Sequence, residues 1–225
     1  MKYYNIYLKR FDKLALSLFL ASDLVVISVS VFFGISVILG TVSIWPDFWN
    51  IGRDWSLGEI ISYIKWLIMI FVFLAAYRRT KEALLLMISL SLMVVLSDDA
   101  LQIHESAGGA FALALNLHLV LGDVAFQIGE LVIWLFLGLV CLLLLYPEWR
   151  RAEGRLRHDL IPVGILFLFV VFFAVVVDAV HSIMPERSLI GGVFLILEDG
   201  GEMVLISAML SYSVGRFWGY DMITK

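Results

Sequence analysis

The sequence predicts an all-α membrane protein, a bundle of six transmembrane helices that forms a single domain over residues 1–225 with both termini in the cytoplasm. Composition is the first reason. Of the 225 residues, 62% are hydrophobic and 16% are charged, whereas a soluble domain is roughly 45–50% apolar and about 25% charged. With a mean hydropathy of +0.97, the chain has more apolar surface than one soluble core can bury. The lengths of its apolar stretches and the placement of its basic residues are the other two reasons.

Six apolar stretches are long enough to cross a bilayer, whose hydrocarbon core requires about 20 residues of helix. The first is not a cleaved signal peptide, because its apolar run is longer than the roughly 7–15 residues of a signal sequence and no A-x-A-like cleavage site follows it. The sequence therefore predicts a multi-pass protein surrounded by the lipid bilayer. The stretches run approximately over 14–40, 58–77, 83–103, 118–146, 160–184 and 189–215.

Basic residues set the predicted orientation, because cytoplasmic segments of membrane proteins carry an excess of Lys and Arg. Most of the 16 basic residues flank the two termini, the connection between the second and third stretches, and the connection between the fourth and fifth. The opposite side carries only Arg53 and Arg187, and Lys65 lies inside the second stretch. This asymmetry predicts cytoplasmic termini in a cell membrane, the plasma or inner membrane.

Two further features exclude other classes of protein. Cys141 is the single cysteine, which excludes a disulfide framework and a cysteine-based zinc site. The net charge of −4 is small, and no block of basic residues is present that would bind nucleic acid. We therefore expect no nucleic-acid partner.

Ionisable residues gather in the last four stretches, although such residues are rare in membrane helices and usually carry function there. At a rise of about 1.5 Å per residue, they lie in the outer half of the bundle. Residues three or four positions apart share a helix face. This spacing pairs Asp178 with His181 and Glu198 with Glu202, so we expect polar groups from several helices to meet at similar depth.

So many carboxylates cannot all stay ionised together in a low dielectric, and the pattern therefore favours a bound cation or shared protons. Mixed carboxylate and imidazole donors favour a divalent metal such as zinc, iron or manganese. Glu105 and Glu130 are the predicted catalytic residues, with a general base among them. Asp99 and Asp123 are interpreted as helix-end residues. The predicted metal ligands are Asp98, His104, Glu105, Asp178, His181, Glu198 and Glu202.

Two short motifs resemble a pattern in uncharacterised prokaryotic six-helix membrane proteins. Those proteins carry an acid five or six residues before a His-Glu pair, which SDDALQIHES matches, and a late helix with acid-acid-x-x-Glu-Met, which LEDGGEM matches. The resemblance spans the third to sixth stretches. It supports the choice of site residues and implies no activity. The matching positions are Asp98 or Asp99, His104, Glu105, Glu198, Asp199, Glu202 and Met203.

Three functions remain open on these residues. The first, which the pattern favours, is a metal-dependent enzyme, a hydrolase or oxidoreductase that acts on a lipid or small apolar substrate. The second is a cation or proton transporter, for which six helices are few, so that we expect a homodimer. No second acidic group near the cytoplasmic face supports a continuous transport pathway. The third is a non-catalytic subunit or sensor that binds a cofactor or a partner helix.

Overall fold

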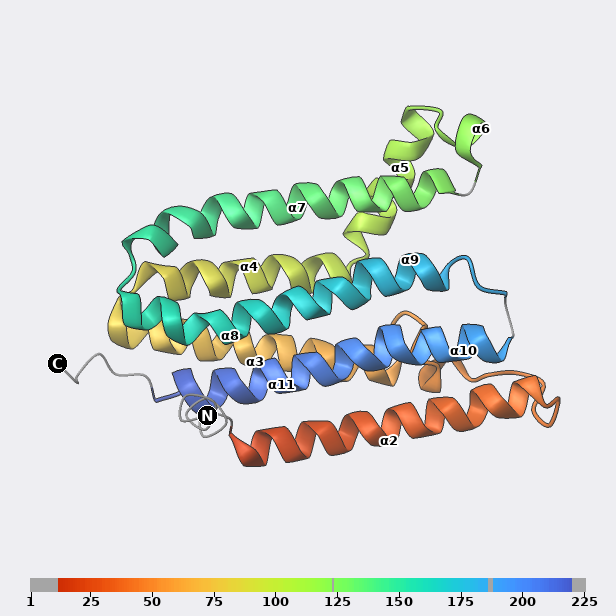
Figure 1. Ribbon diagram of the computed structural model, residues 1–225, viewed down its shortest axis with the longest axis horizontal. Coiled ribbons are helices and arrows are strands. Elements are labelled where there is room, and N and C mark those ends of the chain that lie inside the picture. The colour runs from red at the N-terminus through yellow and green to blue at the C-terminus, as the bar shows by residue number, and fades with distance from the viewer. Residues whose placement is uncertain (1–11, 123, 186–187, 220–225) are drawn as a thin grey trace.

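The computed structural model describes residues 12–122, 124–185 and 188–219, which form helices and no strand. Asp123 and Arg187 lie outside the described residues. The long helices lie side by side with their axes roughly aligned, and α5 and α6 project beyond them at one end (Figure 1). Two of the elements, η2 and η3, are π-helical, and η1 is a 3-10 helix. The elements are α2 (Lys13–Ile38), η1 (Asp47–Trp49), α3 (Leu57–Thr80), α4 (Ala83–Ala100), α5 (Ile103–Ala114), α6 (His118–Leu121), α7 (Val124–Arg151), α8 (Gly154–Val171), η2 (Phe172–Val177), α9 (Asp178–His181), α10 (Leu189–Leu195), η3 (Ile196–Gly200) and α11 (Gly201–Phe217).

Among the described residues, five helices are long and apolar enough to cross a membrane. Four are α2, α3, α4 and α7, and the fifth is the continuous helix Gly154–His181 that α8, η2 and α9 form together. The prediction of an all-α protein rich in membrane-spanning helices is thereby confirmed. The sixth predicted stretch, 189–215, is helical as α10, η3 and α11. It stands apart from the five because it contains three acidic residues, Glu198, Asp199 and Glu202.

The third predicted stretch ends earlier than expected, because α4 stops at Ala100 and not at residue 103. Gln102 takes a left-handed conformation with a φ of 51°. The Asp98 carboxylate then accepts a hydrogen bond from the backbone N–H of His104 at 2.9 Å. This contact satisfies one of the N–H groups that the start of a helix leaves without a partner. A separate helix, α5, therefore begins where a connection was expected.

The predicted bounds of the fourth and fifth stretches were also wrong. Gly122 has a φ of 58°, which interrupts the helix expected from residue 118. The short helix α6 is therefore separate, and α7 starts at Val124 and continues to Arg151. The fifth helix begins at Gly154 instead of residue 160 and ends at His181 instead of residue 184.

Helix α11 lies at the centre of the bundle, where it packs against α2, α3 and α8. Large side chains fill this region, among them Trp66 and Phe73 of α3, Leu156 of α8, and Met209 and Tyr212 of α11. Lipid tails are as apolar as these side chains, so close van der Waals packing holds the helices together. The position of α11 matters for the site, because this helix follows directly on the π-helical segment η3.

A fully buried ion pair joins α2, α3 and α11. The Lys65 ammonium donates to Oδ1 of Asp23 at 2.6 Å and to the carbonyl oxygen of Met203 at 3.1 Å. Ser207 donates from Oγ to Oδ2 of Asp23 at 2.5 Å. The Asp23, Lys65 and Ser207 residues are all 0% exposed. A buried charge requires a partner, and here each charge has the other together with a neutral hydrogen-bonding group.

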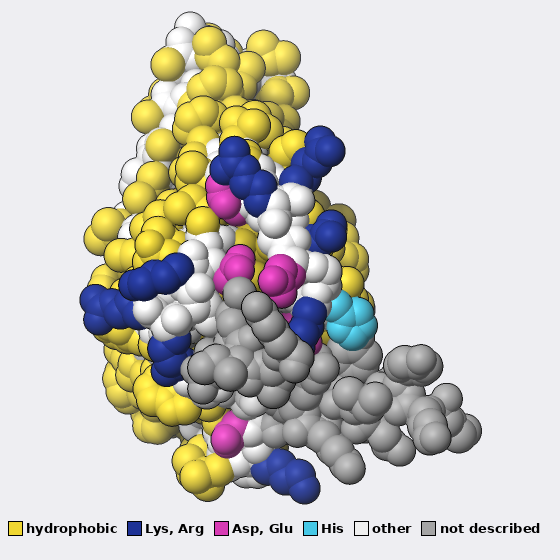
Figure 2. Space-filling view, turned by 90° about the vertical axis from the view of Figure 1, so that its left-hand side faces the viewer, with side chains coloured by type: hydrophobic (Ala, Val, Ile, Leu, Met, Phe, Trp, Pro, Cys, Tyr) yellow, Lys and Arg dark blue, Asp and Glu magenta, His cyan; other side chains and the backbone are white. Residues whose placement is uncertain are grey.

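Lys and Arg side chains gather at the end of the bundle that faces the viewer in Figure 2. At this end α3 turns into α4 and α7 turns into α8, and α2 starts and α11 ends here as well (Figure 1). The start of α2 is tied to α11 by a hydrogen bond from the backbone N–H of Asp12 to the carbonyl oxygen of Ser211 at 3.1 Å. Basic side chains therefore gather at the end of the bundle that the sequence predicts to be cytoplasmic.

Candidate functional site

The first histidine–carboxylate pair consists of Asp98 at the end of α4 and His104 at the start of α5. Nδ1 of His104 donates to Oδ2 of Asp98 at 3.0 Å, while Oδ1 of the same carboxylate caps the helix. Asp98 is 3% exposed. Nε2 of His104 lies 3.9 Å from Oε1 of Glu105, and the imidazole packs against the Trp134 ring of α7. The turn that ended α4 early is thus the feature that creates this pair.

The second histidine–carboxylate pair consists of His181 at the end of α9 and Glu198 in η3. Nδ1 of His181 donates to Oε2 of Glu198 at 2.6 Å. The charge of Asp178 also acts on Glu198. The sequence paired Asp178 with His181 along one helix. The structure instead pairs His181 with Glu198, across two helices.

Two π-helical segments that pack against each other lie next to the second pair. Asp178 follows η2 directly, Glu198 lies in η3, and η2 and η3 are in contact. A π-helical turn bonds residue i to i+5 and so rotates the following side chains relative to an ordinary α-helix. Such turns are frequent at functional sites. Here they direct polar side chains of two neighbouring helices toward each other.

Glu130 of α7 lies within reach of the charges of His104, Glu105 and Asp178. Its position follows from a crossing of α5 and α7 in which the two backbones touch. A Cβ atom added to Gly108 would lie 2.4 Å from the backbone nitrogen of Glu130, and one added to Gly129 would lie 2.2 Å from the carbonyl oxygen of Gly108. Two glycines thus hold α5, with His104 and Glu105 one turn before Gly108, beside Glu130.

The structure also brings acids into the site that the sequence analysis left out. Asp199 has its Oδ2 buried with no hydrogen-bond partner among the described residues, and the charges of Glu198, Glu202 and Glu59 act on it. Asp99, interpreted as a helix-end residue, acts on Glu202 in the same way. The only sequence signal at Glu59 is the capping pattern Ser-x-x-Glu at the start of α3. Its membership of the site depends on how α3 packs against α11.

Two groups near the first pair lie on α5, outside the candidate membrane spans. Burial alone would lower the pKa of His104, but the hydrogen bond to Asp98 and the charges of neighbouring carboxylates raise it above its ordinary value of 6.5. Burial raises the pKa of Glu105, and the charge of Asp54 adds to this effect. Both groups therefore hold a proton to a higher pH than they would in water.

We expect the fluorescence of Trp134 to report the protonation of His104 with a midpoint above pH 6.5. The two ring centroids are 5.6 Å apart, and an imidazolium quenches an indole better than neutral imidazole does. Asp98→Asn should lower the midpoint, because it removes the charge that stabilises the imidazolium. A pH titration of fluorescence in detergent measures it, with His104→Gln and Trp134→Phe to isolate the signal from the other tryptophans.

The sign of the linked stability change follows from the raised pKa of His104. The Asp98–His104 contact stabilises the protein fully below pH 6.5, the ordinary value, and loses this effect as the pH rises through the folded-state value. Asp98→Asn should therefore cost about 1.5–3 kcal/mol at low pH, the value of a hydrogen bond to a charged group. An unchanged fluorescence midpoint in Asp98→Asn would contradict the pairing.

Four of the seven predicted metal ligands form the two pairs, and the seven do not form one coordination shell. Within the ranges that the structure describes, no group of three or more His, Cys, Asp or Glu side chains is placed so that it could hold a metal ion. The donor types suit zinc, iron or manganese, but the arrangement does not supply a third ligand.

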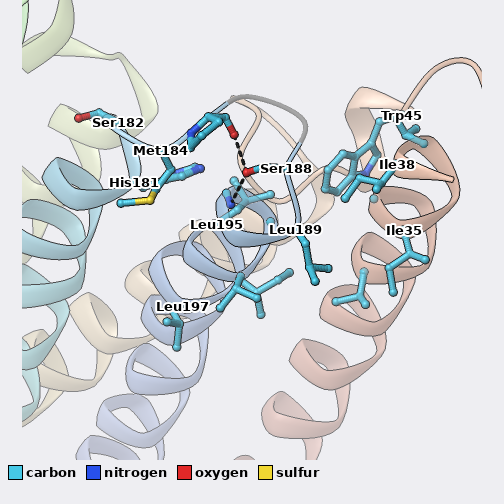
Figure 3. A pocket seen from close by; sticks show the side chains of 18 residues that line it. Ile35, Ile38, Trp45, His181, Ser182, Met184, Ser188, Leu189, Leu195 and Leu197 are labelled. Carbon is cyan, nitrogen blue, oxygen red and sulfur yellow. Dashed lines mark hydrogen bonds between the residues drawn. The ribbon is translucent and has the colours of Figure 1, made fainter. Parts of the chain in front are cut away.

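An apolar groove of about 670 Å³ lies between α2 and α10 and ends at the second pair (Figure 3). Ile35 and Ile38 of α2 form one wall with Trp45, and Leu195 and Leu189 of α10 form the other. The His181 imidazole points from the end of α9 toward α10. The groove therefore connects the apolar flank of the bundle with the histidine whose Nδ1 is bound to Glu198.

One known protein family matches most of this chain. The model of a family described as a domain of unknown function, DUF8692, matches residues 55–215. The chain belongs to the DUF8692 family. No curated protein and no solved structure matches it.

The DUF8692 match runs from the start of α3 almost to the end of α11. Both histidine–carboxylate pairs, the α5–α7 crossing and the π-helical segments therefore lie within the part of the chain that the DUF8692 family shares. Helix α2, with Asp23 and one wall of the groove, lies outside the match. The groove is thus built from a DUF8692 portion and a portion that precedes it.

Proposed function

We propose that this protein is a membrane enzyme that uses its two histidine–carboxylate pairs as acid–base groups on a lipid or other apolar substrate. One observation carries the proposal. In both pairs the carboxylate holds Nδ1 of the imidazole, so that Nε2 makes no hydrogen bond with the described residues. A carboxylate that orients an imidazole and stabilises its charged form is the arrangement of a general base.

The chemistry of the second pair begins at Nε2 of His181, which lies at the end of the apolar groove. Nε2 accepts a proton from a water molecule or from a substrate hydroxyl group, and Glu198 stabilises the imidazolium that forms. Glu105 and Glu130, the predicted catalytic residues, lie near the other imidazole and act as the acids that return a proton to the leaving group. The reaction class that fits is hydrolysis or proton transfer on an apolar substrate.

In a second form of the same proposal, the site binds a divalent metal, which would be zinc, iron or manganese. His104 and His181 would each offer Nε2, and the metal would supply Lewis acidity to a substrate oxygen. An imidazole held by a carboxylate at its other nitrogen is common among metal ligands. The remaining predicted donors are Asp98, Glu105, Asp178, Glu198 and Glu202.

The test is lipid turnover by purified protein. We expect the wild type to convert a component of a bacterial polar lipid extract, measured by mass spectrometry, and we expect His181→Gln and Glu198→Gln to be at least 100-fold slower, the usual contribution of general acid–base catalysis. His158→Gln, near the start of α8 at the basic end, is the matched control and should keep full activity. Elemental analysis of the same samples tests the metal. Equal rates in His181→Gln and the wild type would overturn the proposal.

Proton or cation transport is the second candidate, and the buried network below the site favours it. Lys65 binds the carbonyl oxygen of Met203, the residue that follows Glu202, and Ser207 and Ser211 continue a line of buried polar groups along α11. Together with Asp23, these groups extend the buried polar side chains beyond the site along α11. Uptake of protons into liposomes, measured with a pH-sensitive dye and slowed in Ser207→Ala, would favour transport over catalysis.

The number of membrane spans and their orientation are also part of the proposal. We place six spans in the plasma or inner membrane, with α10, η3 and α11 as the sixth and with both termini in the cytoplasm. The basic end of the bundle in Figure 2 supports this orientation. A transporter of this size would function as a homodimer, whereas the enzyme requires only the single bundle.

A further inference from the structure

The groove between α2 and α10 lies at the depth of the bilayer, so that lipid molecules can enter it. Helix α2 is one of the membrane-length helices, and Val31, Ile35 and Ile38 line the groove from its outer half. On the opposite wall lie Leu195 and Leu197. Apart from His181, Ser182 and Ser188, the side chains that surround the space are apolar, so the molecules of the bilayer that fit it are acyl chains.

The wall that α10 contributes to the groove leaves space at Gly192, where an added Cβ atom would meet nothing within 4 Å. At the opposite wall, Gly34 allows the Trp45 ring to lie against α2, since a Cβ atom there would come within 2.8 Å of that ring. Glycines therefore leave space beside α10 and admit the Trp45 ring to the wall of the groove.

The outer end of the groove carries polar groups of a particular kind. Trp45 lines the groove, and its indole Nε1 is a buried donor without a hydrogen-bond partner among the described residues. The Ser188 hydroxyl is already used, because it donates to the carbonyl oxygen of Pro185 and accepts from the backbone N–H of Gly191. The donor that remains is Nε1 of Trp45, and a ligand that satisfies it must offer an acceptor oxygen at one end.

We propose that the groove binds a glycerophospholipid, with one acyl chain between α2 and α10 and an ester or phosphate oxygen accepting a hydrogen bond from Nε1 of Trp45. A long apolar chain that ends in acceptor oxygens, and that is present at the groove in high concentration, meets all three observations. Binding does not depend on the acid–base chemistry. Only the further step, that this lipid is the substrate, rests on the proposed function, and it then places the ester bond near His181.

The experiment measures phospholipid retained by protein purified in mild detergent, together with binding of dioleoylphosphatidylglycerol to delipidated protein. We expect near-stoichiometric phospholipid on the wild type and loss of most of it in Gly192→Leu, which fills the groove. Gly164→Leu is the matched control, because a Cβ atom there also meets nothing and Gly164 lies on α8, away from the groove. Trp45→Phe keeps an aromatic ring and removes the donor, and should weaken binding about tenfold, the change that one hydrogen bond produces.

The outcomes separate this proposal from the proposed function. Glu198→Gln should retain phospholipid while losing turnover, so that a failure of catalysis leaves lipid binding intact. Equal phospholipid in Gly192→Leu and the wild type would overturn the groove as the binding site. A quinone, a sterol or a free fatty acid in place of the phospholipid would overturn the assignment of the ligand.

Discussion

Replacing Lys65 with Met is expected to destabilise the protein by about 3–5 kcal/mol, the usual cost of removing one partner of a buried ion pair. Lys65 and Asp23 are 0% exposed and 2.6 Å apart. Without the ammonium group, the Asp23 carboxylate would stay inside the bundle with Ser207 as its remaining donor. Unfolding of detergent-solubilised protein by added SDS, followed by circular dichroism, measures the free-energy difference.

The double variant Asp23→Leu with Lys65→Met is the control for this prediction. It removes both charges at once, and a buried ion pair replaced by apolar groups of similar size is often neutral in stability. We therefore expect the double variant to be much more stable than Lys65→Met or Asp23→Leu alone. Losses that simply add in the double variant would show that the two charges do not stabilise each other.

The sequence predicted the membrane helices well because they depend on local properties, the length of apolar runs and the positions of charges. It drew attention to residues such as His181 and Glu198 for the same reason, since an acid or a histidine in a membrane helix is unusual wherever it points. The pairings themselves were less accessible. His181 and Glu198 are 17 residues apart and meet only because two π-helical segments pack together. No local pattern indicated either segment.

The start of α5 is a second instance in which long-range structure decided the outcome. A continuous helix would have placed Asp98, Gln102 and Glu105 on one face. Instead, the left-handed conformation of Gln102 ends α4, and the Asp98 side chain caps the helix that follows. Asp and Asn side chains near helix starts are recognisable as caps when they directly precede the helix, but this one acts from six residues before His104. The buried ion pair is a further case. The sequence shows Asp23 and Lys65 as separate charges, but no local pattern indicates that the two side chains are in contact.

Gly129→Ala is expected to separate α5 from α7 and to lower stability by at least about 1–3 kcal/mol, the usual cost of overpacking. Its Cβ atom would lie 2.2 Å from the carbonyl oxygen of Gly108. Neither atom belongs to a flexible side chain, so one of the two helices must move. Gly108→Ala should behave alike, because its Cβ atom would meet the backbone of Glu130 at 2.4 Å. Unfolding by SDS measures the loss.

The neighbouring glycines make this prediction specific to the crossing. A Cβ atom at Gly109 approaches only the Phe126 ring, at 3.9 Å, and one at Gly138 of α7 meets nothing. Ala at either position should be neutral or stabilising, because Ala favours a helix over Gly by about 1 kcal/mol. If Gly108→Ala and Gly109→Ala cost the same, the backbones do not touch as described. If Gly108→Ala also abolishes the pH response of Trp134 and Gly109→Ala does not, the crossing is what holds His104 against α7. The shape of the site then depends on Gly108 and Gly129, which carry a hydrogen atom where alanine carries a methyl group.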